Sequence, residues 1–114
     1  MAERINTGVP LLIFDAKVPG AGVLSDVYGV PENDKHTSYT LTWRTKFATN
    51  PTAVSISIQQ ALNDVAAEFA AIDTSTYITD GEQRIFYPFT GRFIRAIINS
   101  HTGGTLYTVE VMLT

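Results

Sequence analysis

The sequence has no cysteine, no long apolar run and few basic residues, and each shortage excludes a class of protein. A chain of 114 residues without cysteine can have neither a disulfide framework nor thiolate ligands for a metal. The longest apolar runs span about four residues, far below the roughly 20 that a membrane-spanning helix needs. Eight scattered Lys and Arg residues and a net charge of −3 do not form the basic patch that nucleic acid requires. We therefore expect neither a membrane nor a nucleic-acid partner.

The N-terminal stretch MAERINTGVP has a single Arg and no apolar core, so it does not have the pattern of a secretory signal peptide. We expect a protein that is made in a cytoplasm. The length fits one domain over residues 10–114, and the polar residues 1–9 are expected to be an N-terminal arm that orders on a partner.

What the sequence has in abundance is β-branched residues, with 34 Val, Ile and Thr among 114. Such side chains favour the pleated, half-buried surface of a sheet. Apolar and polar residues also alternate in most segments, as expected of strands that bury one face. Strands are predicted at 10–17, 24–30, 36–47, 53–62, 84–89, 92–100 and 105–113, with a loop at 18–26 and turns at 31–35, 48–52, 79–83 and 101–105.

Seven or eight short strands with turns every 8 to 12 residues predict an all-β fold, namely a two-sheet antiparallel β-sandwich of jelly-roll type. A small β-barrel is the alternative. Segment 63–75 fits either a helix or a turn and a short strand, and we prefer the strand. Pro88 cannot donate to a ladder, so 84–89 is expected at a sheet edge.

Alternation also predicts the core and the way the chain ends. The inward rows are expected to be Tyr39, Leu41, Trp43 and Phe47, then Val54, Ile56, Ile58 and Leu62, and finally Tyr107, Val109, Val111 and Leu113. Strand 92–100 is apolar on both faces, and a C-terminal hairpin is predicted between 92–100 and 105–113. A central last strand needs no polar tail after it.

No residue pattern predicts a catalytic, cofactor or metal site. His36 and His101 lack the spacing of a metal motif, and no nucleophile elbow is present. The oxygen-bearing groups Glu32, Asn33 and Asp34, and likewise Asp73, Asp80 and Glu82, lack the spacing of a calcium loop and are interpreted as turn residues. Gly20, Ala21 and Gly22 are interpreted as a flexible loop and not as a phosphate loop. We expect a protein that is not an enzyme.

The remaining candidates are interface residues. An aromatic stripe of Tyr39, Trp43 and Phe47 fits either a core or a platform for sugar rings, and the core is favoured. A charge within the apolar strand 92–100 needs a partner, and a salt bridge from Arg95 to a neighbouring strand is favoured over an intersubunit contact. The candidate interface residues are Tyr28, Tyr77, Tyr87, Arg92 and Arg95.

The order of elements over residues 36–114 resembles small β-sandwich domains of tailed-bacteriophage virion proteins. The similar parts are the strand SYTLTWRTKF, the run NPTAVSISIQ and, most specifically, RFIRAIINSHTGGT. Such domains often contain R-Y-[IV]-R-A-x-[IV]-x-S-x-T-G-G. This chain departs from them at 61–64, where Ala-Leu-Asn-Asp replaces Ser-x-Asp-Gly, and at Phe69, where the family has Trp. These are turn and core positions, so the departures leave the fold in place.

The resemblance implies a structural protein of a virion that is assembled in a bacterial cytoplasm. The expected function is a capsid decoration protein that binds other virion proteins, above all the major capsid protein, as a homo-oligomer or many-copy subunit. A tail or baseplate component is one alternative. A carbohydrate-binding β-sandwich, in which exposed aromatics stack on sugars, is the other.

Overall fold

The protein is a two-layer β-sandwich made from one eight-stranded sheet that folds over on itself, as seen in a computed structural model that describes residues 3–31, 38–79 and 82–114. The expected all-β sandwich fold is therefore confirmed, and the open strand order excludes the barrel. The strands are β1 (Glu3–Arg4), β2 (Leu11–Lys17), β3 (Val23–Leu24), β4 (Tyr28–Gly29), β5 (Tyr39–Ala61), β6 (Ala70–Ser75), β7 (Gln83–Phe89) and β8 (Phe93–Leu113).

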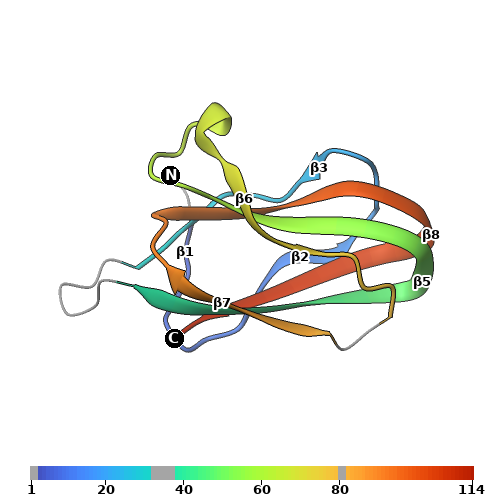
Figure 1. The fold of residues 1–114 in the computed structure, drawn as a ribbon, viewed down its shortest axis with the longest axis horizontal. Helices are drawn as coiled ribbons and strands as arrows, with labels where there is room; N and C mark the ends of the chain where they lie inside the picture. The colour runs from blue at the N-terminus through green and yellow to red at the C-terminus, as the bar shows by residue number, and fades with distance from the viewer. Residues whose placement is uncertain (1–2, 32–37, 80–81) are drawn as a thin grey trace.

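Two long strands organise the fold. β5 has 23 residues and β8 has 21, and they pair antiparallel from Leu41 opposite Leu113 to Ala61 opposite Phe93. The paired ribbon bends back on itself at one end of the molecule, where Pro51 lies opposite Gly103 (Figure 1). A folded antiparallel ribbon of this kind is the basis of the jelly-roll arrangement that the sequence predicted.

The predicted turns at 48–52 and 101–105 are wrong, because both segments are corners inside continuous strands. The predicted C-terminal hairpin is wrong for the same reason. Segments 92–100 and 105–113 are two halves of β8, and each half pairs with β5. Turn-forming residues are still needed at the corner: Gly103 and Gly104 have φ of +67° and +78°, a region that glycine adopts without steric cost.

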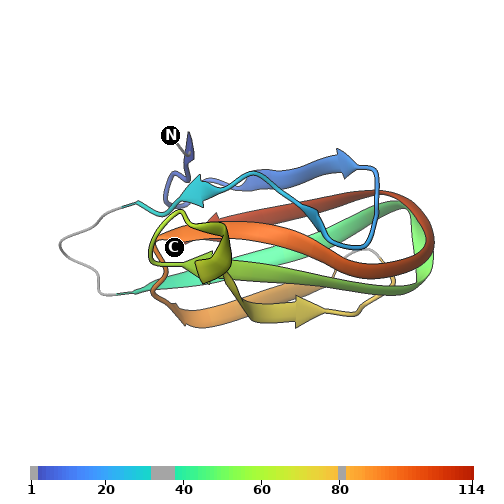
Figure 2. The same cartoon turned by 90° about the horizontal axis from the view of Figure 1, so that it is seen from above.

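The corner divides the sheet into two layers. Layer A contains β7, residues 39–47 of β5, residues 107–113 of β8, and β2. Layer B contains β6, residues 54–61 of β5, residues 93–98 of β8, then β3 and β4. Seen from above, the strands run from β2 and β3 on one side through β8 and β5 to β6 and β7 on the other (Figure 2).

Residues 3–8 pack on the domain. β1 pairs in parallel with β4, so the sheet is not wholly antiparallel. The amide of Ile5 donates to Gly29 O at 2.9 Å, and that of Gly8 donates to Leu113 O at 2.7 Å. Residues 3–8 therefore cross from layer B to layer A, and Ile5 is 1% exposed in the core.

The core lies between the layers and follows the predicted alternation closely. The inward rows of 39–47 and of 107–113 are all buried, and the rings of Phe47 and Tyr107 meet edge to face with centroids 4.9 Å apart. The prediction for Leu62 is wrong: this side chain is 69% exposed, because β5 ends at Ala61. Side chains alternate between the two faces only along a strand, so the alternation does not predict burial for a residue that follows its end.

The predicted strand in segment 63–75 is confirmed as β6, which follows a single 3-10 turn, η1 (Ala66–Glu68). The helix alternative does not form there. Pro88 lies in β7, an edge strand that pairs with β5, as its missing N–H predicts. Most of the predicted turn 31–35, and Asp80 and Gly81 of the turn 79–83, lie outside the described residues. In the described part of the chain, no helix has the length and apolar character to cross a membrane.

Candidate functional site

The three candidate tyrosines differ in exposure. Tyr28 is 8% exposed, pairs with Ile94 and belongs to the core, so it is not a surface residue. Burial, with smaller contributions from Asp26 and Glu3, raises the pKa of its hydroxyl. Tyr77, in the connection after β6, is 48% exposed, and Tyr87, on β7, is 67% exposed. Two of the three tyrosines are therefore available to a partner.

Among the described residues, no carboxylate of a neighbouring strand forms the predicted salt bridge with Arg95. The residue opposite it on β5 is Gln59, whose Oε1 accepts a hydrogen bond from Arg95 Nε at 2.7 Å. The guanidinium also lies 4.2 Å from the centre of the Phe69 ring, a cation–π contact. Partial burial lowers the pKa of Arg95, and the nearby charge of Asp64 opposes this effect. The Gln59 amide and the Phe69 ring therefore contact the guanidinium, for which a carboxylate partner was expected.

Arg92, the other candidate arginine, is exposed just before β8. Its amide donates to Ala61 O at 3.0 Å, and its carbonyl accepts from the amide of Val30 at 2.9 Å. The backbone of Arg92 therefore links the end of β5 to the segment after β4.

The aromatic stripe on β5 is core and not a platform for sugars. Tyr39, Trp43 and Phe47 are 7%, 1% and 6% exposed. The preference for the core is confirmed, and a ring that is enclosed by the two layers has no face to offer a sugar.

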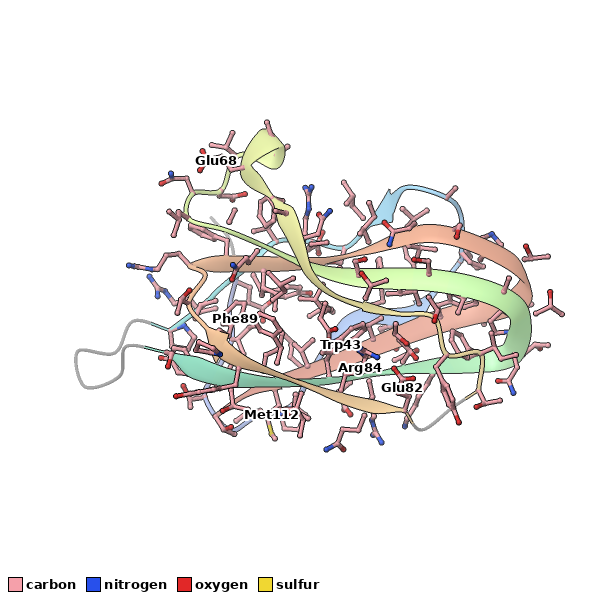
Figure 3. All side chains as sticks on the ribbon, in the orientation of Figure 1. Trp43, Glu68, Glu82, Arg84, Phe89 and Met112 are labelled. Atoms are coloured by element: carbon pink, nitrogen blue, oxygen red, sulfur yellow. The ribbon has the colours of Figure 1, made fainter. Side chains whose placement is uncertain are left out.

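A polar clip, made of Trp43, Asp73, Ser75, Glu82 and Arg84, closes one side of the sandwich between β6 and β7. Asp73 accepts two hydrogen bonds from Arg84, Nε to Oδ2 at 2.9 Å and Nη2 to Oδ1 at 2.8 Å. Oδ2 also accepts from Trp43 Nε1 at 2.9 Å. Glu82 Oε1 accepts from Arg84 Nη1 at 3.0 Å and from Ser75 Oγ at 2.9 Å. Figure 3 shows the side chains of Trp43, Arg84 and Glu82 close together at this side.

The clip was not predicted from the sequence, which assigned Asp73 and Glu82 to turns. Burial alone would raise the pKa of Asp73, but the hydrogen bonds from Arg84 and Trp43 outweigh burial and hold that pKa below its usual value. The hydrogen bonds to Asp73 and Glu82 raise the pKa of Arg84. Every strong donor in the clip has an acceptor within the clip, so we assign it a structural role. Opposite charges on two successive edge strands were the signal that could have revealed it.

We expect Asp73→Asn to lower the free energy of unfolding by about 1–3 kcal/mol at pH 7, because Arg84 loses its bidentate acceptor. The depressed pKa of Asp73 stabilises the fold above the unfolded pKa of about 3.9, and this contribution is lost as the pH falls through the folded pKa. The acid-induced loss of stability should therefore be smaller in the variant than in the wild type. Urea unfolding from pH 7 to about pH 2 measures both effects. The exposed Asp15→Asn is the matched control, and equal acid dependence in wild type and Asp73→Asn would contradict the prediction.

The outer face of layer A is the most promising surface for a partner. This outer sheet face consists of the apolar side chains Leu12, Ile85, Tyr87 and Met112 and the charged side chains Arg44, Lys46 and Glu110. Ile85 is 66% exposed and Leu12 is 41% exposed, although both are apolar residues within paired strands. In Figure 3, Met112 points away from the interior on this side. Apolar side chains that are gathered on a regular sheet are a common feature of protein interfaces.

An ion pair lies at the centre of the outer sheet face. Arg44 Nε donates to Glu110 Oε1 at 2.8 Å, across the pairing of β5 with β8. A shallow hollow lies on each side of this pair, one lined by Pro10, Thr42 and Met112 among others, the other by Leu12, Lys46 and Thr108. The face therefore offers protruding apolar groups, two hollows and charges of both signs.

The other candidates that lie within the described residues show no arrangement that points to catalysis. The ring of His101 lies against Tyr107, with centroids 5.8 Å apart, and its Nδ1 is 3.2 Å from Gly103 O. His36, Asp80 and the group at 32–34 lie outside the described residues. Among the residues that are described, no three His, Asp or Glu side chains are grouped to hold a metal ion. The amide of Gly22 donates to Ile98 O at 2.7 Å, which attaches the 20–22 loop to β8.

Comparison of the chain with protein-family models and with curated proteins finds no match.

Proposed function

We propose that this chain is a non-enzymatic structural protein of a bacteriophage virion, and specifically a capsid decoration protein. The observation that carries the proposal is the outer sheet face, a surface with mixed apolar and charged side chains on strands that are held in a continuous ladder. A surface of this kind associates with another virion subunit, whether a different protein or a further copy of the same chain, by burying its apolar centre while its charges set the register. In a particle, many copies make weak single contacts sufficient.

The resemblance of residues 92–105 to virion domains supports the proposal from the sequence. These residues form the first half of β8 and the corner. Part of the pattern has a structural reason: a Cβ on Gly104 would lie 2.9 Å from Tyr107 Oη and 3.0 Å from Thr49 O, so only glycine fits there. The inward Ile94, Ala96 and Ile98 are core. The inward residues of this segment thus serve the fold, and we place the association surface on the outer sheet face.

The carbohydrate-binding alternative is less favoured. Sugar sites place aromatic rings in a row beside carboxylates or amides. The one tryptophan is buried, and the two exposed tyrosines, Tyr77 and Tyr87, come from different elements.

We expect purified protein to bind, saturably and at a defined copy number, to particles assembled without it. Co-sedimentation at increasing protein concentration measures this binding. Because the contact buries apolar surface and does not release counterions from nucleic acid, it should survive moderate salt. Failure to co-sediment would contradict the proposal, and micromolar binding to a glycan array would favour the carbohydrate-binding module in its place.

A further inference from the structure

The outer sheet face has the features that it needs to bind the same face of a second copy of the chain. A two-fold interface is self-complementary, so one patch must carry both members of every contact. Here Ile85 and Tyr87 protrude on the edge strand β7, while the hollows lie further in, over β5 and β8, and reach Pro10 and Leu12 on the β2 side. The charges are of both signs, with Arg44 on β5 and Glu110 opposite it on β8.

We infer that the partner that covers the outer sheet face is a second copy of this chain, packed face to face about a two-fold axis. The inference rests on the proposed function in one respect, namely that this face is an association surface in the particle.

The two-fold axis runs parallel to β5 and β8, between these two strands and in the plane of the interface. Rotation about this axis places β5 of one copy over β8 of the other, and β7 over β2.

The strand register then decides which residues meet. Arg44 and Glu110 are direct partners in the ladder and lie at the same height along the strands, so Arg44 lands over Glu110 of the second copy. Ile85 is level with Thr42 and Met112. It therefore lands over the hollow that Pro10 and Met112 line. Each contact occurs twice, once on each side of the axis, and the arrangement places no like charges opposite one another along the Arg44–Glu110 row.

The size of the face predicts a weak dimer. Four strands about 4.8 Å apart and about seven residues long cover about 440 Å² in projection. A standard stable interface buries about 800 Å² from each partner. We therefore expect a dissociation constant of about 10 μM to 1 mM for the isolated protein, with tighter association where copies are concentrated on a particle.

The first experiment measures association of the full chain by sedimentation velocity from about 10 μM to about 1 mM. The wild type should show a monomer–dimer equilibrium, and Ile85→Glu should weaken it at least tenfold, because a carboxylate would be buried in an apolar hollow. The matched control is Leu24→Glu, on the outer face of layer B, where Leu24 is 43% exposed. This control should associate like the wild type. A wild type that stays monomeric, or a control that loses association as Ile85→Glu does, would overturn the inference.

The second experiment isolates the contact between copies from the ion pair within one copy. Arg44→Glu and Glu110→Arg each place like charges opposite one another in a homodimer, so each variant alone should be monomeric. A mixture of the two variants should form a heterodimer, because one face then carries two acidic groups and the other two basic groups. Thermal melts establish that both variants are folded. A mixture that stays monomeric would overturn the inference.

The two proposals can fail separately. A monomeric protein that still binds particles would leave the decoration function standing without the dimer. A dimer that does not bind particles would leave the interface standing without the function.

Discussion

A chain that ends at Thr105 is expected not to fold cooperatively. The truncation removes Tyr107, Val109, Val111 and Leu113, each of which is at most 1% exposed. Four such side chains contribute about 6–12 kcal/mol of burial free energy, as much as the whole stability of a typical domain, about 5–15 kcal/mol. Urea unfolding followed by the fluorescence of the single tryptophan measures the result.

The topology makes this truncation worse than the loss of an edge strand. Residues 107–113 lie between β5 and β2, so their removal leaves β2 without a ladder partner and leaves the layer A part of β5 paired only with β7. The matched control within the removed segment is Leu106→Asn, at an exposed corner position with φ of +44°, which Asn tolerates. It should change the free energy of unfolding by less than about 0.5 kcal/mol. A truncated chain that still unfolds in one sharp transition would show that layer A does not depend on β8.

Trp43→Ala is expected to lower the free energy of unfolding by about 3–5 kcal/mol. Trp43 is 1% exposed, and its ring fills the space between the layers beside the polar clip. Truncation creates a cavity and also removes the indole N–H that donates to Asp73 Oδ2. In a domain of this size the melting temperature should fall by about 12–20 °C.

Two further variants identify the cause of that loss. Trp43→Phe keeps a buried ring but removes the donor, so it should cost less than Trp43→Ala. Tyr77→Ala removes an exposed aromatic side chain and should leave the melting temperature nearly unchanged. An unchanged melting temperature in Trp43→Ala would show that the ring is not part of the core.

The sequence-based predictions that were confirmed depended on local properties of the strands, above all the alternation of apolar and polar residues. Alternation along 36–47 and 105–113 identified the inward rows correctly, because a side chain on a strand can point to only two sides. Pro88 identified an edge strand, because a residue without an N–H cannot donate to a ladder on that side. These are properties of the local backbone, and a single sequence contains them.

The errors came from places where distant segments decide the local structure. Asn-Pro-Thr at 50–52 and Thr-Gly-Gly at 102–104 have the composition of turns, but Pro51 lies opposite Gly103, so both strands bend together and the ladder continues. Arg95 was expected to need a carboxylate, yet the register places Gln59 opposite it and brings Phe69 under its guanidinium. Neither partner is near Arg95 in the sequence, so its own surroundings could not reveal them.

The sequence by itself determined an all-β fold, the inward rows of the central strands and the edge position of β7, since steric preference and alternation act residue by residue. Only the tertiary structure decided that four predicted strands are two long ones, that residues 3–8 join the two layers, and that Asp73 and Arg84 meet in a clip. It also decided the candidate interface, because the outer sheet face takes side chains from four strands. The physical reason is that register and layer packing depend on contacts between residues far apart in the chain, which local patterns do not specify.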